Sequence, residues 1–390
     1  MDINIAYLKK GQLHLKLHHA PVRIINSEFG QVTQERLRQI QKRNFLRNRG
    51  PMANFVPPEM LKAMDQREEP ETPVNFSSIC LGEDGQLFYA LSIGSVSGVF
   101  CLDSDFMKEK RLFHGSDHAV EYLDINNNNL IACVTRYANG TANIATMSPE
   151  GSRLRDITEG DSIDIAPHWI PGINKALVFQ SAGLGRNSQG FVVEKSPFRI
   201  EKLDFDRQEI DTLVADPQTD YLSPQMSSDG SLYYISRPYT PIGKSFNILD
   251  ILKDIILMPF RLLYALFQML NFFTMRFTGK PLQTGGNPQN IDSEQMNAWG
   301  EQIDVQKATK ANRFGDADAP SLVPRSWELI KRNSNNETTV IAQGVLAFDL
   351  NSDGTILYTN GSGIYYIDEN GVSKRLLVDK LIQQVAFLNK

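Results

Sequence analysis

The sequence predicts an all-β protein, a six-bladed β-propeller. Three observations support this prediction: a recurring turn followed by an apolar strand, a spacing of about forty residues between larger units, and short strands at both ends of the chain. The turn-and-strand pattern occurs at Asp84–Tyr89, Asp229–Tyr234 and Asp353–Tyr358. Asp-Gly favours a tight turn, and the β-branched and aromatic residues that follow it favour a strand.

A second hairpin follows most of these patterns. Ile144–Met147 leads to the turn Ser148–Gly151, and Ile364–Ile367 leads to the turn Asp368–Gly371. Two hairpins make a unit of four strands, the size of a propeller blade. We expect five units that begin near Phe76, Ala119, Ile163, Tyr221 and Val345, and the fourth of them is interrupted by a long insertion.

We expect the sixth unit to combine both ends of the chain. Leu381–Leu388 supplies one strand, and Ile3–Leu8, Leu13–Leu17 and Val22–Ile25 supply three more. A ring closed in this way has no free sheet edge on which other chains could add strands.

Two segments resemble the S-P-x-[WF]-S-P-D-G repeat of TolB-type propellers, a family with WD40-like Pro-Asp repeats. They are Ala166–Gly172 and Ser223–Gly230. The resemblance implies a six-bladed propeller of a kind that serves mostly as a binding platform, and some such propellers carry hydrolase domains. TolB also has a signal peptide and an extra N-terminal domain, and we expect neither here.

The predicted blades divide the chain into five parts. They are 1–26 (strands that close the last blade), 27–75 (a basic helical arm and a Pro-rich linker), 76–237 (blades one to three and part of four), 238–324 (a helical, strongly apolar insertion) and 325–390 (the rest of blade four, blade five and the closing strand).

The arm is basic in an acidic protein. We expect Thr33 to cap a helix that ends at Arg47; from Glu35 to Arg49 there are six basic residues and one acidic residue. The net charge of the whole chain is −5, so nucleic acid is not an expected partner. We expect this helix to be either a solvated surface or a contact for anionic lipid headgroups through Arg36, Arg38, Lys42, Arg43 and Arg47.

The insertion contains the most apolar segment of the chain, Phe246–Phe273. Arg261 and Pro259 interrupt it, and both flanking strands are assigned to one blade, so we expect it to enter and leave a membrane on the same side. It either binds a membrane or docks on a protein partner or a second copy. Ile255, Ile256, Phe260, Leu263, Phe267, Leu270, Phe272 and Phe273 would make the apolar contact, and Arg261, Arg276 and Lys280 would meet headgroups. A polar helix from about Ser293 to Ala311 follows.

No motif predicts a catalytic residue, a metal ligand or a cofactor. Asp349–Gly354 resembles the start of a calcium loop, but Asn360 stands where the loop needs a glutamate. Asp124, Asn126 and Asn128 are an equally weak indication of a calcium site. His114–His118 and Gly183–Ser188 are predicted to be turns.

The cysteines and the N-terminus indicate a reducing compartment. Cys80, Cys101 and Cys133 form no paired motif, and Lys9 and Lys10 interrupt any signal sequence. The sequence therefore predicts a non-catalytic scaffold, peripheral to the cytoplasmic face of a membrane. The alternatives are a subunit of a soluble complex that docks through the insertion, and a hydrolase-type propeller with a site in its central funnel.

Overall fold

In the computed structural model, the structure describes residues 3–18, 20–47, 72–173, 175–241, 295–312 and 316–388, without the side chains of 41–42, 44–47 and 301. Apart from Pro241, these residues belong to one compact unit, Met1–Thr240 with Gln295–Lys390. Pro241–Glu294 forms a second unit, which lies outside the described residues except for Pro241.

The described unit is built mainly from antiparallel sheets. One sheet contains β4 (Asn75–Leu81), β5 (Leu87–Ile93), β6 (Val96–Leu102) and β7 (Glu109–Gly115) in that order. A second contains β17 (Thr219–Met226), β18 (Leu232–Pro238), β21 (Glu328–Arg332) and β22 (Thr338–Gln343), and a third contains β23 (Ala347–Leu350), β24 (Ile356–Thr359), β25 (Gly363–Ile367) and β26 (Ser373–Val378). The strands β4, β17 and β23 lie where the sequence predicts that units begin.

A nine-stranded sheet contains two antiparallel halves. One half has β8 (Ala119–Ile125), β9 (Ile131–Arg136), β10 (Ala142–Met147) and the short β11 (Arg155–Asp156). The other has β12 (Ser162–Trp169), β13 (Ala176–Arg186), β15 (Arg199–Asp204) and β16 (Glu209–Val214), with β14 (Val192–Lys195) paired to the end of β13. A single parallel pair, Ala142 with Ile163, joins the halves.

The two ends of the chain share one sheet. Its order is β27 (Ile382–Phe387), β1 (Ile5–Lys9), β2 (Gln12–Lys16) and β3 (Arg23–Ile25). Ile5 pairs with Phe387 and Tyr7 with Val385. These four strands lie where the sequence predicts them, and the leucines that alternate along β2 are buried.

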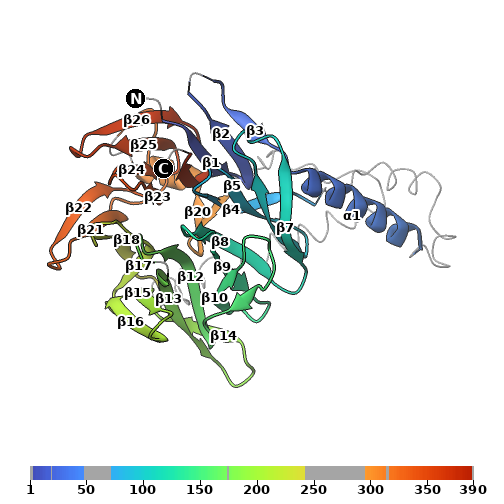
Figure 1. Ribbon diagram of the computed structural model, residues 1–390, viewed down its shortest axis with the longest axis horizontal. Helices are drawn as coiled ribbons and strands as arrows, with labels where there is room; N and C mark the ends of the chain where they lie inside the picture. The colour runs from blue at the N-terminus through green and yellow to red at the C-terminus, as the bar shows by residue number, and fades with distance from the viewer. Residues whose placement is uncertain are drawn as a thin grey trace, which may run out of the picture. The chain divides into compact units, whose positions relative to one another are not determined.

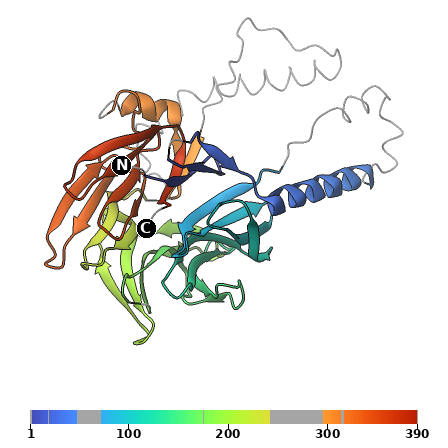
Figure 2. The same cartoon turned by 45° about the horizontal axis from the view of Figure 1, so that its top comes forward.

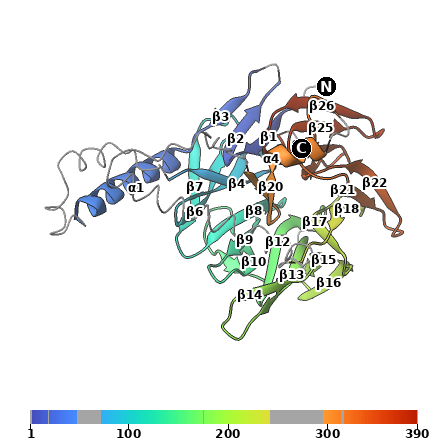
Figure 3. The same ribbon diagram turned by 180° about the vertical axis from the view of Figure 1, so that it is seen from behind.

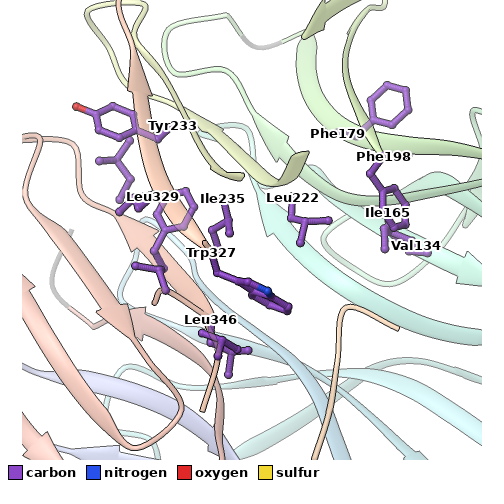
Figure 4. Packing of buried hydrophobic residues seen from close by; sticks show 14 of the residues in the cluster. Val134, Ile165, Phe179, Phe198, Leu222, Tyr233, Ile235, Trp327, Leu329 and Leu346 are labelled. Atoms are coloured by element: carbon purple, nitrogen blue, oxygen red, sulfur yellow. The ribbon is translucent and has the colours of Figure 1, made fainter. Parts of the chain in front are cut away.

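The strands β4, β8, β12 and β17 lie toward the middle of the unit, and β7, β16 and β22 lie toward its rim, as the opposite views in Figure 1 and Figure 3 show. β16, β22 and β26 lie at the rim and are largely exposed, whereas the residues of β8, β12 and β17 are all buried or half-buried. Side chains from several sheets meet in the largest core cluster. Trp327, Ile235 and Leu346 belong to it and are labelled with other members in Figure 4.

Helix α1 (Glu28–Arg47) begins five residues before the predicted Thr33. Ser27, not Thr33, caps it: its Oγ accepts a hydrogen bond from Gly30 N at 3.0 Å. The first turn packs on the β4–β7 sheet, where the Phe29 ring lies 5.0 Å from that of Phe100. Thr33 is buried and Leu37 packs against the core cluster that contains Phe100, and the C-terminal part of α1 extends away from the sheet (Figure 2).

The helix predicted from Ser293 to Ala311 is wrong over most of its length. Residues 295–304 form a hairpin of β19 (Gln295–Ala298) and β20 (Glu301–Asp304), and only α4 (Val305–Ala311) is helical. Trp299 and Gly300 turn the chain at φ 52° and 81°, a left-handed conformation that a helix does not contain. Asp304 caps α4 by accepting from Lys307 N at 3.0 Å.

No helix among the described residues is long and apolar enough to span a bilayer. The predicted contact segment Phe246–Phe273, with Arg276 and Lys280, lies outside the described residues. In the chain it falls between β18 and β19, and the β19–β20 hairpin and α4 precede β21, which pairs with β18 through Ser236 and Glu328.

Candidate functional site

A pocket of about 600 Å³ lies where the inner strands meet. Each sheet contributes to its wall, and so does the β19–β20 turn. Each inner strand contributes at least one lining residue. These include Ser78 of β4, Asp124 of β8, His168 of β12, Gln225 of β17, Asp349 of β23 and Gln384 of β27.

Polar side chains at or near this pocket link neighbouring sheets, and one of them links the two halves of the nine-stranded sheet. Ser78 Oγ accepts from Leu123 N at 2.8 Å, which links β4 to β8. Asp124 Oδ2 then accepts from Trp169 N at 2.6 Å, which links β8 to β12. The buried Gln180 of β13 continues the series by accepting from the backbone N–H of Ser223 in β17. Each bond satisfies an inner-strand N–H that lacks a partner in its own sheet at that point.

The series continues through the remaining sheets. Gln225 accepts from Leu350 N at 2.9 Å and donates to Phe348 O at 3.1 Å, which links β17 to β23. Asp349 Oδ2 accepts from Phe387 N at 2.8 Å, which links β23 to β27. Gln384 then bonds to Ile79 in β4, where the series began.

Three pocket residues have an unusual backbone. Tyr122, Ala166 and Ser223 have φ values of 51°, 54° and 51°, although none is glycine. Each lies at an irregularity in pairing with the second strand of its sheet. Such conformations persist only where surrounding contacts hold them, and they cluster at binding and catalytic sites. The irregularities turn Asp124, His168 and Gln225 toward neighbouring sheets and the pocket.

An ion pair adds charge to the pocket wall. Arg136 Nε donates to Glu121 Oε2 at 3.1 Å, and both side chains remain about one-quarter to one-third exposed. Burial raises the pKa of the adjacent Tyr122 hydroxyl, the charge of Glu121 raises it further, and Arg136 opposes this. The part of the wall that remains accessible thus carries a carboxylate and a guanidinium side by side.

The β19–β20 turn places an aromatic ring in the pocket. The Trp299 ring stacks on the ring of Tyr122, with centroids 5.7 Å apart and planes 21° apart. Trp299 Nε1 donates to Leu346 O at 2.8 Å, and Arg237 Nη2 donates to Trp299 O at 3.3 Å. The indole is therefore held by contacts from three sheets.

Arg237 forms a buried ion pair below this turn. It lies 3.0 Å from Asp220 Oδ2, and the two side chains are 2% and 1% exposed. Asp220 also accepts from Phe198 N at 2.8 Å, and the guanidinium lies 4.6 Å from the centroid of Trp327. This cluster holds the point at which the chain leaves β18.

The polar groups of the pocket do not form a metal site in the part of the chain that the structure describes, where no group of three potential ligands occurs. Asp124 and Asp349 bind backbone N–H groups, as described above. Asn126 Oδ1 accepts from Asn128 N, and Asp353 Oδ1 accepts from Thr355 N, so both calcium-like runs serve as turns. His168 Nδ1 is buried without a hydrogen-bond partner among the described residues.

The contact residues predicted on the basic arm lie on α1. Arg36, Arg38 and Arg43 are exposed there, and the backbones of Lys42 and Arg47 belong to the same helix. The predicted apolar contact residues lie outside the described part of the chain, so their role stays a prediction.

Sequence reasoning did not locate the central pocket. The repeat segments Ala166–Gly172 and Ser223–Gly230 contain part of its wall, and their common small-residue-Pro start marks the left-handed positions. Glu121, Arg136 and Trp299 carry no such signal, because they come together only when distant sheets assemble.

Comparison with known proteins gives structural matches only. TolB from Acinetobacter baumannii matches with a TM-score of 0.51 at 10% identity, over 100% of this chain and 67% of that one. A chain of a nidogen/laminin complex matches with a TM-score of 0.50 at 6% identity, over 99% and 98%. The tricorn protease matches with a TM-score of 0.47 at 12% identity, over 99% of this chain and 34% of that one. No family model and no curated protein matches. The chain thus has a TolB-like β-propeller fold.

Proposed function

We propose that this chain is a non-catalytic binding platform, a closed six-bladed propeller whose central pocket contacts a partner. The observation that carries the proposal is the pocket itself. The four four-stranded sheets and both halves of the nine-stranded sheet contribute to its wall. The series of hydrogen bonds around the pocket ends where it began, with Gln384 bonded to Ile79 of β4. A complex of nidogen with laminin is among the structural matches, which supports protein binding as a use of this kind of fold.

A binding role agrees with how the pocket acids are used. Asp124 and Asp349 bind backbone N–H groups of neighbouring strands, so their carboxylates are committed to structure. General acid–base chemistry needs a carboxyl group within hydrogen-bond reach of a substrate proton. The open ion pair of Glu121 with Arg136 suits recognition of a partner's charges.

A quantitative capture experiment tests the proposal. Tagged wild type, Arg136→Glu and Lys175→Glu are expressed at equal levels in the native host, and bound proteins are quantified by mass spectrometry. Lys175 is the matched control, because it also pairs with an acid, Asp206 at 2.7 Å, but lies 66% exposed and away from the pocket. We expect one partner to be lost, at least tenfold, from Arg136→Glu only. Equal recovery from all three forms contradicts the proposal.

We further propose that Phe246–Phe273 attaches the platform to the cytoplasmic face of a membrane. The segment lies between β18 and β19, and Arg237 of β18 donates to the backbone oxygen of Trp299, just after β19, at 3.3 Å, so both ends of the segment start close together. A segment tied in this way dips into one leaflet or lies along it. The three cysteines are buried and none of them forms a disulfide, which agrees with a reducing compartment.

Flotation with vesicles that contain phosphatidylserine tests the attachment. The intact protein is compared with a variant in which a Gly/Ser linker replaces residues 244–280. If the intact protein alone floats, the segment is a membrane anchor. If neither form floats and the intact form is oligomeric, the segment docks on protein, as in a soluble complex, and the membrane proposal fails.

A further inference from the structure

Trp299 occupies one part of the central pocket, and its contacts define the chemistry of a ligand site. We propose that this aromatic subsite accepts a ligand with a planar ring and an N–H donor, such as an indole, in exchange for the Trp299 side chain. The proposal rests on the proposed binding function, because it names the chemistry that the pocket recognises.

The wall of the subsite selects for such a ring. The Tyr122 ring provides a flat face, on which the indole lies at a centroid distance of 5.7 Å. The carbonyl of Leu346 provides an acceptor, 2.8 Å from the indole nitrogen. That carbonyl has a fixed position, since Leu346 N donates to Thr359 O at 2.8 Å. A ring without an N–H donor would leave this acceptor unpaired.

The turn that carries Trp299 is strained. Trp299 has a φ of 52° and is followed by Gly300 at 81°, so a bulky aromatic residue occupies a conformation that glycine or asparagine ordinarily adopts. Its stacking partner Tyr122, at φ 51°, is strained in the same way. Strain of this kind is found at switch regions and ligand clamps. A ligand that replaces the indole lets the turn relax.

The base of the hairpin is anchored, whereas its tip is open to solvent. Met296 and Val305 are 3% and 6% exposed and belong to the main core. Asn297 and Gly300 near the tip are exposed, whereas Ala298 and Trp299 are half-buried against the main core. Release of the indole breaks its hydrogen bond to Leu346 O while the buried base stays in place, and the pocket beside it has room for a ligand.

The charged residues next to the subsite also favour a ligand that carries polar groups. Glu121 precedes Tyr122 in β8 and pairs with Arg136 at 3.1 Å. A ligand with amide groups next to its ring can bind the carboxylate and the guanidinium together. A tryptophan side chain in a turn of a partner protein has this chemistry, and so does a small indole amide.

The test is a titration with N-acetyltryptophanamide, followed by calorimetry and saturation-transfer NMR. Wild type, Trp299→Ala and the double variant Tyr122→Ala/Trp299→Ala are compared, after thermal unfolding shows that each is folded. We expect wild type to bind, Trp299→Ala to bind at least tenfold more tightly because no internal ring competes, and the double variant to lose that gain. If Trp299→Ala does not fold, Trp299→Leu keeps apolar volume at the turn and takes its place.

Two results overturn the proposal. One is equal affinity of wild type and Trp299→Ala, which would mean that the indole does not occupy the ligand site. The other is binding by Trp299→Ala but not by wild type, which would mean that the Trp299 side chain does not leave the subsite. A capped peptide copy of residues 295–304 assigns the source: tighter binding than the amide indicates a partner protein, and equal binding indicates a small molecule. If no probe binds in the titration but Arg136→Glu still loses the partner in the capture experiment, the proposal of an aromatic ligand is rejected and the proposed binding platform is retained.

Discussion

Gln384 and Ile79 exchange two hydrogen bonds although 305 positions separate them in the chain. Gln384 Oε1 accepts from Ile79 N at 3.1 Å, and Gln384 Nε2 donates to Ile79 O at 3.0 Å. One side chain of the last strand thus replaces a missing backbone partner on β4. This contact completes the series of inter-sheet bonds around the pocket.

The first prediction concerns this contact. Gln384→Leu keeps the approximate volume of the side chain but leaves the N–H and the carbonyl of Ile79 unpaired. We expect the free energy of unfolding to fall by about 1–3 kcal/mol, the usual cost of an unsatisfied buried polar group. Urea unfolding measures the change. Gln189→Leu, in the exposed turn after β13, is the control and should change stability by less than about 0.5 kcal/mol.

The second prediction concerns the buried pair Arg237–Asp220. Arg237→Met leaves the Asp220 carboxylate buried without its counter-ion, which should cost about 3–5 kcal/mol. The double variant Arg237→Met/Asp220→Asn should recover much of this loss, because the introduced amide has no charge to bury and its oxygen can still accept from Phe198 N. Urea unfolding compares the two variants with wild type. A double variant as unstable as Arg237→Met would show that the charge is not the cause.

The third prediction concerns pH. The His14 imidazole is 6% exposed and stacks on Tyr7 with centroids 4.9 Å apart. Burial lowers the pKa of His14, the Lys9 charge lowers it further, and Asp379 opposes this. Because the unfolded chain then binds more protons, stability is full above the ordinary pKa of about 6.5 and declines as the pH falls below it.

The comparison of wild type with His14→Phe measures this effect. The phenyl ring keeps the stack on Tyr7 and cannot take up a proton. We expect the stability of wild type to fall more steeply than that of His14→Phe between pH 7 and pH 5. Parallel pH profiles would contradict the assignment.

The fourth prediction concerns the apolar insertion. Leu263→Asp with Phe267→Asp places two charges on the segment that is proposed to enter the membrane. A charge in the apolar region of a bilayer is costly, about 2.5–3.5 kcal/mol at its centre on the translocon scale, so the variant should remain in the unbound fraction with anionic vesicles. Co-sedimentation measures the bound fraction, and unchanged sedimentation would reject the membrane contact.

Much of the strand order follows from local sequence. Asp-Gly turns and alternating apolar residues locate the inner strands and the sharing of one sheet by both ends, because turns and strand faces depend on near neighbours. The hairpin at 295–304 was not predicted from the sequence, because it depends on contacts with residues far away in the chain. Its polar residues have a helix-like composition, and the deciding contacts of Trp299 with Tyr122 and Leu346 come from distant strands.

The candidate site was even less accessible to sequence reasoning. Nothing in the sequence marks Glu121 and Arg136 as site residues. They form an ion pair in the pocket wall only because of where β8 and β9 lie in the unit. The left-handed conformation of Tyr122 has no sequence signal at all, whereas the proline after Ala166 and after Ser223 offers a partial one.

Site-specific photo-crosslinking tests the central claim most directly. A benzoylphenylalanine is placed at Asn297, an exposed residue that lines the pocket, or at Val340, 48% exposed on the rim strand β22. Both forms are irradiated in cells. A binding platform centred on the pocket predicts a discrete covalent adduct from position 297 and none from position 340. An adduct from position 340 alone would contradict the account and place the partner on the rim.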